Sequence, residues 1–376
     1  MPDSAEPDQR VVQLRQDIAA RMAAYFNTGS PARGLPLSQH GIQALDLLRE
    51  FSLRPGKLLR GTLAALSYEM FHMDDAVNDH GEIRGSGRQA ALDLALAIEL
   101  NQIYLLIVDD VMDRSETRRG GLTMHRMFEQ LGGQGLAPDA AGSDHLNNML
   151  AVNVGLIAGH LSAGIIAAAP APATHVARAL QLFNDNITAT ALGQIDDMYN
   201  SVAQAGLVED DILRTYLLKS SYYTCINPLQ TGAALAGADE AALQACHDIG
   251  LHAGLAFQLQ DDIIGMFGDS DATGKSSLDD LREGKRTILM HYAAEHTTPE
   301  GVAILRRALG NPAVTEADLA QVRAVLSDSG ARRYVVERAA DEMNQAITIL
   351  QSQPGWHQQS AEQLGGVFRR LLDRAA

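Results

Sequence analysis

The chain has 376 residues, of which 46% are hydrophobic, and a formal net charge of −16 at pH 7. This acidity argues against a nucleic-acid partner, because such a partner needs a basic surface. An anionic substrate would have to be met by local cations or by a metal ion. The two cysteines, Cys225 and Cys246, lack the spacing of metal ligands, so a reducing, cytoplasmic setting is predicted.

Two stretches bear on membrane association. The first ten residues are polar and acidic and contain no apolar core, which argues against a signal peptide. Residues 146–177 contain no charged side chain, but they are rich in Ala and Gly and are interrupted by Pro170 and Pro172. A spanning helix needs about 20 strongly apolar residues. We therefore expect a buried helix here, and a protein that is not an integral membrane protein.

In chain order, residues 1–36 are predicted to form a weakly ordered arm with one amphipathic helix over 11–26. Glycine and proline breakers separate this arm from the rest. Residues 37–376 are predicted to form a single domain, in which apolar residues recur every three or four positions. Alternating β-branched runs and Asn-Gly or Asp-Gly hairpin signals are missing, so we expect no strands.

The segment 88–113 is apolar almost all round and predicts a central helix that its neighbours bury. A glycine-rich loop follows at residues 132–142. Further helices are predicted at residues 146–169, 174–199, 209–236, 240–267, 284–295, 299–309, 316–326, 332–351 and 360–374. The fold class is therefore all-α: a bundle of about ten helices around a central cavity, with its site between facing helices.

The most informative stretch is residues 100–120, in which an apolar helix ends in three carboxylates and two arginines follow. On a helix, positions four apart share a face, so Asp109 and Asp113 should point the same way. Crowded carboxylates repel one another unless a cation lies between them. Arg118 and Arg119 add side chains suited to phosphate. The pattern predicts a site for Mg²⁺ and a diphosphate.

Two other clusters have a related character. Asp261 and Asp262 end a second apolar segment and are followed by Lys275 and Lys285, whereas most other Asp pairs are interpreted as solvated helix faces. Upstream, a Pro-Gly turn at 55–56 should open a helix with Lys57 and Arg60 near its N-terminus, where the helix dipole favours an anion.

Together these motifs resemble the trans-isoprenyl diphosphate synthases, also called polyprenyl synthetases. The resemblance runs from Arg54 to Lys285, and the motifs occur in the family's order. It implies an isoprenoid-synthase fold, a homodimer and an Mg²⁺-dependent prenyltransferase. This enzyme would condense isopentenyl diphosphate with an allylic prenyl diphosphate, using about three Mg²⁺ ions. The implied metal ligands are Asp109, Asp113 and Asp261.

The resemblance also assigns substrate-binding residues. For isopentenyl diphosphate these would be Gly56, Lys57, Arg60, Gln102 and Arg119. For the allylic or leaving diphosphate they would be Arg118, Gln194, Asp197, Lys219, Ser220, Lys275 and Lys285. The implied catalytic set is Asp109, Asp110, Asp113, Arg118, Lys219, Gln258, Asp261 and Asp262.

Two details qualify the resemblance. The family's second motif is DDxxD, and its fifth position here is Gly265; the lost carboxylate would be replaced by water, or by Asp269 if the helix continues that far. Product length would be set by Tyr104 and Leu105, which precede the first aspartate by five and four positions. A single aromatic at these positions favours a geranylgeranyl (C20) product over a farnesyl (C15) product.

Two other functions stay open at this point. A class I terpene cyclase shares the fold and the first motif, and residues 261–269 lean part of the way towards its second motif. The Arg-Pro-Gly-Lys segment and Arg119 count against it, because a cyclase needs no isopentenyl site. The chain could also be the non-catalytic regulatory subunit of a heteromeric synthase, with Gly265 as the lesion.

Overall fold

The computed structural model describes residues 8–28, 34–72, 86–131, 144–202, 208–268 and 277–372. Its packing divides the chain into two compact units. The first comprises Met1–Leu180 with Ala234–Gly237, and the second comprises Gln181–Ala233 with Ala238–Ala376. Each unit has its own hydrophobic core. The all-α fold class is confirmed, whereas a single domain over residues 37–376 stays a prediction.

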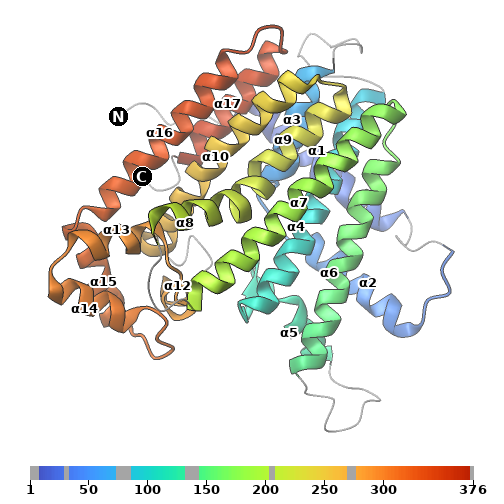
Figure 1. Cartoon of the computed structure of the whole chain (residues 1–376). Helices are drawn as coiled ribbons and strands as arrows, with labels where there is room; N and C mark the ends of the chain where they lie inside the picture. The colour runs from blue at the N-terminus through green and yellow to red at the C-terminus, as the bar shows by residue number, and fades with distance from the viewer. Residues whose placement is uncertain are drawn as a thin grey trace. The chain divides into compact units, whose positions relative to one another are not determined.

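The first unit is built around α4. Its elements are α1 (Gln9–Asn27), α2 (Gln39–Ser52), α3 (Leu59–Phe71), α4 (Ser86–Met112), β1 (Thr117–Arg118), β2 (Gly121–Leu122), α5 (Met124–Leu131), α6 (Asp144–Ala167) and the beginning of α7 (Ala173–Val202). Figure 1 shows α6 running alongside α4, its most extensive partner. The core around α4 includes Leu96, Leu100, Ile103 and Ile107. The predicted central helix at 88–113 is therefore present and buried.

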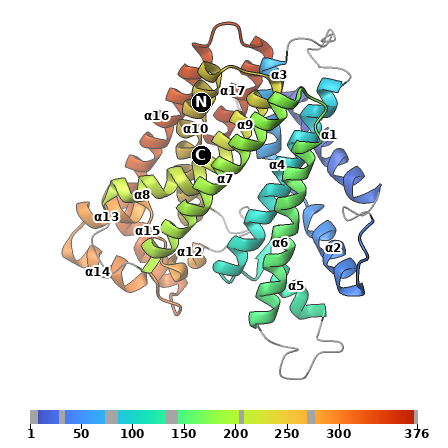
Figure 2. The same cartoon turned by 45° about the vertical axis from the view of Figure 1, so that its right-hand side comes forward.

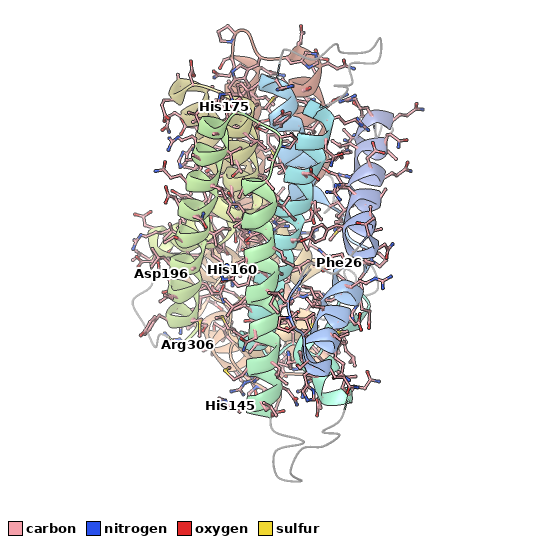
Figure 3. The ribbon with its side chains drawn as sticks, turned by 90° about the vertical axis from the view of Figure 1, so that its right-hand side faces the viewer. Phe26, His145, His160, His175, Asp196 and Arg306 are labelled. Carbon is pink, nitrogen blue, oxygen red and sulfur yellow. The ribbon has the colours of Figure 1, made fainter. Side chains whose placement is uncertain are left out.

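The N-terminal helix α1 follows from a cap and an apolar stripe. Asp8 accepts a hydrogen bond from the Arg10 N–H (2.8 Å) and caps the first turn. The apolar residues at spacings of three and four are buried, among them Ile18 and Phe26, and α1 packs against α3 and α4. Figure 3 labels Phe26 on this helix, and His145 and His160 along α6. The helix predicted at 11–26 is confirmed.

The absence of strands was a wrong prediction. Thr117 pairs with Leu122 and Arg118 with Gly121 in a two-stranded antiparallel hairpin. Its two turn residues, Arg119 (φ 54°) and Gly120 (φ 74°), both have positive φ, which is the geometry of a type I′ turn. Arg is rare at such a position because its Cβ crowds the backbone. The usual Asn-Gly signal is therefore missing from the sequence.

The second unit holds most of α7 and the C-terminal helices. Its further elements are α8 (Glu209–Thr215), the π-helix η1 (Tyr216–Ile226), α9 (Asn227–Ala236, whose last residues belong to the first unit), α10 (Glu240–Phe267), α12 (Ser277–Glu283), α13 (Ile288–His296), α14 (Pro299–Ala308), α15 (Glu316–Asp328), α16 (Ala331–Gln351) and α17 (Gln358–Leu372). The long helix α10 packs against η1 and α16, and Figure 2 shows α16 beside it.

Sequence periodicity predicted one α-helix over 209–236, but its middle is the π-helix η1. Three glycines face this segment. A Cβ at Gly193 would lie 2.3 Å from the backbone nitrogen of Lys219. A Cβ at Gly250 would lie 2.7 Å from Ile226 Cα, and one at Gly254 would lie 2.5 Å from Ser221 Cα. The wide π-helix can pack against α7 and α10 because these positions carry no side chain.

Other helix boundaries follow local capping. The predicted bounds of α10 at 240–267 are confirmed: Asp239 accepts from the Ala242 N–H and caps its start. The helix predicted at 284–295 begins later, at Ile288, because Gly284 has φ 73° and the Thr287 side chain caps α13. The short helices α5 and α12 were not predicted. They raise the number of helices above the expected ten or so.

Within the part of the chain that the structure describes, two helices are long and apolar enough to cross a bilayer by length and composition alone. They are the 87–112 part of α4, with a mean hydropathy of 1.7, and α6, with 1.8. In the apolar stretch of each helix, 61% of the residues of α4 and 33% of the residues of α6 are buried within the protein. The same features are found in the core helices of globular proteins, and α4 fits that description.

Candidate active site

The first aspartate cluster lies at the C-terminal end of α4. The Asp113 N–H donates to the Asp109 carbonyl oxygen (2.8 Å), so the helical turn continues through Asp113. Asp109 and Asp113 therefore share one face, as predicted, and both side chains are half-buried. Partly exposed carboxylate oxygens one turn apart suit Mg²⁺, which combines a few carboxylates with phosphate oxygens and water. The donor set present here fits that ion.

Asp110 has a different environment, because its side chain is fully buried. Arg118 Nε donates to Asp110 Oδ1 at 2.8 Å, and Arg118 Nη2 donates to the same oxygen. Arg118 Nη2 also lies 3.7 Å from Asp109 Oδ2. The hairpin thus returns Arg118 to the end of α4. Asp110 thus holds its guanidinium beside Asp109.

A second cluster in the first unit joins α3 to α4. Glu99, which is fully buried, accepts from the Gly61 N–H at 2.8 Å. With its amide oriented by these neighbours, Gln102 donates to Glu99 Oε2 (3.0 Å) and accepts from Arg60 Nη1 (3.0 Å). Arg60 is 6% exposed. The fold therefore brings together Arg60 and Gln102, two residues predicted to bind isopentenyl diphosphate. Glu99 fixes the Gln102 side chain by accepting its hydrogen bond.

Arg119 belongs to the same cluster. A Cβ at Gly56 would lie 3.2 Å from Arg119 Cζ, so the predicted Gly56 lies against this guanidinium. Burial lowers the pKa of Arg119, as do the charges of nearby arginines, whereas Glu99 raises it. Burial raises the pKa of Glu99, and the Gly61 N–H and the nearby arginines counteract that rise. Cations crowded in this way favour an anion.

Lys57 was predicted near the N-terminus of a helix, but α3 begins only at Leu59. Leu58 has φ 48°, a left-handed conformation, and acts as the N-cap without a side-chain bond. Lys57 is exposed and lies just before the helix. Residues 55–58 have no regular secondary structure, so the expected turn at 55–56 is not seen and the left-handed Leu58 directs the chain into α3.

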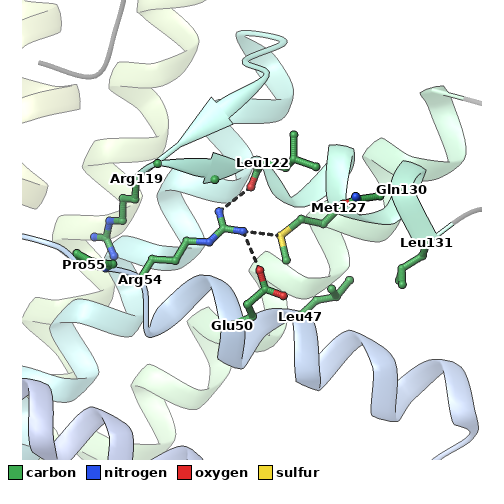
Figure 4. A pocket seen from close by; sticks show the side chains of 11 residues that line it. Leu47, Glu50, Arg54, Pro55, Arg119, Leu122, Met127, Gln130 and Leu131 are labelled. Carbon is green, nitrogen blue, oxygen red and sulfur yellow. Dashed lines mark hydrogen bonds and ion pairs between the residues drawn. The ribbon is translucent and has the colours of Figure 1, made fainter. Parts of the chain in front are cut away.

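Arg54 positions the hairpin, and this contact was not predicted from the sequence. Its Nη1 donates to the Leu122 carbonyl (2.6 Å) and to the Arg118 carbonyl (3.3 Å), and its Nη2 contacts Glu50 and Met127 (Figure 4). A Cβ at Gly121 would lie 2.7 Å from Arg54 Cζ. The neighbouring pocket of about 510 Å³ is lined partly by Arg54, Arg119 and Leu122. The sequence feature that could have indicated this hairpin is the glycine pair Gly120-Gly121, which follows two arginines.

The two residues predicted to set product length differ little in burial, and both are half-buried. The Tyr104 ring lies against α6. A Cβ at Gly155 would be 3.4 Å from Tyr104 Cδ2, and a Cβ at Gly159 would be 3.3 Å from Tyr104 Cδ1. Two glycines one turn apart on α6 thus make room for this ring.

In the second unit, α10 ends with Asp261 and Asp262. Asp261 is exposed and Asp262 is half-buried. Asp262 Oδ1 accepts from Gln258 Nε2 (2.9 Å), and Ser220 Oγ donates to Gln258 Oε1 (2.6 Å). Three predicted residues, Ser220, Gln258 and Asp262, are therefore joined in one network.

Tyr216 is the fourth member of this network, and it was not predicted from the sequence. Its hydroxyl donates to Asp262 Oδ2 and accepts from the Ile288 N–H at 3.2 Å. Burial and the Asp262 charge hold the pKa of Tyr216 well above its usual value, so the phenol remains a donor. Its position four residues before Ser220, on the same helical face, was the available signal.

Two further predicted cations of the second unit, Lys219 and Lys285, are partnered by carboxylates. Lys219 Nζ lies 2.6 Å from Asp197 Oδ2, which joins η1 to α7. Lys285 Nζ lies 2.6 Å from Glu283 Oε2. Gln194 is half-buried on α7, one turn before Asp197. Lys275 lies outside the described residues.

The end of α10 bears on whether water or Asp269 replaces the carboxylate that the second motif lacks at Gly265. Gly265 lies on α10 one turn after Asp261. The helix ends at Phe267, and Gly268 has an extended conformation (φ −70°, ψ 162°). The condition that the helix continues to residue 269 is therefore not met. Asp269 itself lies outside the described residues.

Residues 43–326 match the profile of the polyprenyl synthetase family. The chain belongs to this family. It is 29% identical over 319 residues to geranylfarnesyl diphosphate synthase of Aeropyrum pernix, covering 85% of this chain and 90% of that protein. It is 31% identical over 258 residues to geranylgeranyl diphosphate synthase of Mycobacterium tuberculosis, covering 68% and 67% of the two chains.

Solved structures agree with this membership. Geranylgeranyl pyrophosphate synthase of Corynebacterium glutamicum, complexed with isoprenyl diphosphate and magnesium, superposes with a TM-score of 0.82. It is 26% identical, with 98% of this chain and 99% of that chain covered. The predicted resemblance and the enzyme class, a prenyl diphosphate synthase, are thus confirmed. Neither the cyclase nor the regulatory subunit finds support among these relatives. The roles of individual residues stay predictions.

Proposed function

We propose that this polyprenyl synthetase condenses isopentenyl diphosphate with an allylic prenyl diphosphate and releases a longer trans-prenyl diphosphate, in the C15–C20 range with C20 favoured. The observation that carries the proposal is the end of α4. Asp109 and Asp113 share a face there, and Asp110 holds Arg118 beside them. The bound isoprenyl diphosphate and magnesium of the C. glutamicum enzyme support the same substrates and ion.

The isopentenyl diphosphate would bind at the cluster formed by Arg60, Gln102 and Arg119. Gly56 would let the diphosphate approach the backbone, and the exposed Lys57 would add a cation at the entrance. Glu99 balances part of the positive charge and fixes the Gln102 amide. Preorganised side chains of this kind bind without being rearranged at the moment of reaction.

As the resemblance to the family implies, Mg²⁺ at the aspartate-rich motifs would bind the allylic diphosphate. We propose three Mg²⁺ ions, held by Asp109, Asp113 and Asp261. Bound Mg²⁺ supplies a Lewis acid that favours departure of the diphosphate. Arg118, Lys219, Lys275 and Lys285 would stabilise the negative charge that develops on the leaving group, and the released diphosphate would accept the proton lost in the last step.

The product length would depend on the side chains that precede the first aspartate. Tyr104 and Leu105 would limit how far the growing chain extends. The Gly155 and Gly159 positions of α6 set where the Tyr104 ring can lie. A single aromatic at this level supports C20 over C15.

We further propose that the enzyme is a cytoplasmic homodimer. Helix α6 exposes large apolar side chains, Met149, Leu150 and Leu156, and exposed apolar patches of this kind mark interaction surfaces. A second copy of the chain is the expected partner. Sedimentation of the purified protein would test this state, and a monomer at micromolar concentration would contradict it.

The test of the function is a product assay. Purified protein is incubated with Mg²⁺, isopentenyl diphosphate and, in separate reactions, C5, C10 and C15 allylic diphosphates. A chain-elongated product that disappears with EDTA is expected, with C20 as the end point. Cyclised product formed without consumption of isopentenyl diphosphate, or no turnover at all, would contradict the proposal.

A further inference from the structure

Tyr216 has an unusual position for a residue outside the recognised motifs. It is the first residue of η1, its side chain is buried, and its hydroxyl lies between two other segments of the second unit. The hydroxyl donates to Asp262 Oδ2 on α10 and accepts from the Ile288 N–H at the start of α13. One oxygen atom thus joins three elements.

On the α10 side, the contacts form a short ladder. Tyr216 and Ser220 are four residues apart on η1, and they contact Asp262 and Gln258, which are four residues apart on α10. The Gln258 amide then donates to Asp262 Oδ1 at 2.9 Å. Each oxygen of the Asp262 carboxylate therefore accepts a hydrogen bond from a defined donor. The orientation of the carboxylate follows, because two donors fix its plane.

On the α13 side, Tyr216 stabilises the segment that follows Lys285. Ile288 is the first residue of α13, three positions after Lys285, and Thr287 caps the helix. The N–H of a first helical residue has no partner within its own helix. The Tyr216 oxygen accepts this N–H and thereby anchors the end of the Lys285 segment.

We propose that Tyr216 is a positioning residue for the diphosphate end of the site. It keeps the Asp261–Asp262 end of α10 and the Lys285 segment in a fixed arrangement, and this inference rests on the proposed function. Gly265 leaves α10 with one carboxylate fewer than a DDxxD motif carries, so more depends on the orientation of the two that remain. A phenol serves here because it donates to a carboxylate and accepts from a backbone N–H at the same time.

The test replaces Tyr216 by Phe, which removes the hydroxyl and leaves the ring. Calorimetry measures the affinity for inorganic pyrophosphate in the presence of Mg²⁺, and steady-state kinetics measures KM for each substrate. Because a hydrogen bond to a charged group is lost, we expect pyrophosphate affinity to fall about tenfold and the allylic KM to rise similarly. The KM for isopentenyl diphosphate, whose predicted residues lie on other elements, should stay within about twofold.

Tyr334→Phe is the matched control. Tyr334 lies in the same unit, and its hydroxyl also donates to a carboxylate, Glu209 (2.7 Å). This variant should bind pyrophosphate as the wild type does. Unchanged pyrophosphate affinity in Tyr216→Phe, an equal loss in Tyr334→Phe, or an equal rise in both KM values would overturn the inference.

Asp262→Asn completes a double-mutant cycle. If Tyr216 acts through Asp262, the double variant should bind pyrophosphate little worse than Asp262→Asn alone. Fully additive losses would overturn the inference. The calorimetric measurement keeps the two proposals separate, because it needs no turnover. A wild-type protein that binds pyrophosphate but makes no elongated product would refute the proposed function and still allow Tyr216 to be tested.

Discussion

The two aspartate pairs, Asp109–Asp110 on α4 and Asp261–Asp262 on α10, share an order of exposure. In each pair the first carboxylate is the more exposed and the second is held by donors of the protein. The chemistry of the donors differs. Asp110 takes its bonds from a guanidinium, whereas the described donors to Asp262 are the Tyr216 phenol and an amide.

This difference separates two ways of fixing a carboxylate. A charged donor neutralises a buried carboxylate and is itself held in place, so Asp110 and Arg118 act as a pair. Neutral donors orient a carboxylate without cancelling its charge, which suits the half-buried Asp262. In the first pair the carboxylate of Asp110 therefore positions a cation, whereas in the second pair the carboxylate of Asp262 is itself positioned by neutral donors.

The largest expected effects concern the first member of each pair. Asp109→Asn and Asp261→Asn should each lower kcat/KM on the order of a thousandfold, equal to about 4 kcal/mol, because each removes the charge of a proposed metal ligand. Asp46→Asn, an exposed position on α2, serves as the control. Steady-state kinetics at saturating Mg²⁺ measures the effect. A loss below tenfold for Asp261→Asn would show that the second pair does not contribute as the first does.

The second members should differ in stability. Asp110→Asn leaves the Arg118 guanidinium without its buried charge partner and should lower the free energy of unfolding by about 3 kcal/mol. Asp262→Asn loses one hydrogen bond from a neutral donor and should cost about 1 kcal/mol. Urea denaturation followed by circular dichroism measures both values. Equal costs would remove the distinction between a charged and a neutral support.

A packing contrast gives a smaller effect. Gly254→Ala would place a Cβ 2.5 Å from Ser221 Cα on η1, and we expect a loss of about 2 kcal/mol from the overpacking. A Cβ at Gly164 on α6 would meet no neighbouring atom within 4 Å, so Gly164→Ala should be neutral or raise stability by up to about 1 kcal/mol. Thermal denaturation of the two variants checks this. Similar melting temperatures would contradict the close packing around η1.

The smallest effect concerns pH and belongs to the first unit. Burial raises the pKa of Glu99 above its usual value of 4.5. Its contribution to stability is therefore fully present below the unfolded pKa and is lost as the pH rises through the folded pKa. The free energy of unfolding of the wild type, measured relative to that of Glu99→Gln, should therefore be lower at about pH 7 than at about pH 5. Urea denaturation at both values measures the change, and a wild type that gains on the variant with rising pH would contradict it.

The sequence was sufficient where a face or a cap determines the structure. The four-residue spacing of Asp109 and Asp113 placed them on one helical face, and the predicted bounds of α10 match the structure, in which Asp239 caps the helix. Arg60 and Gln102, far apart in the sequence, were grouped only by resemblance to the family. In the structure, Arg60 Nη1 lies 3.0 Å from the side-chain oxygen of Gln102.

The sequence was insufficient where the backbone departs from common conformations. The hairpin turn places Arg119 at positive φ, a conformation that arginine rarely adopts, so the residue type did not indicate the turn. The π-helix η1 has the apolar periodicity of an α-helix, so nothing in its own residues marks the change. Tyr216 was not predicted because the contacts of its hydroxyl are to Asp262 and Ile288, which are distant in sequence.

The glycines that face η1 also limit how this enzyme can be engineered. Substitutions at Gly193, Gly250 or Gly254 would force the backbones of neighbouring helices apart, whatever the new side chain contributes. Libraries that aim at other product lengths should therefore hold these three codons fixed and place their diversity elsewhere, for example at positions 104 and 105. Variants sampled this way would retain the scaffold on which Lys219 and Ser220 are presented.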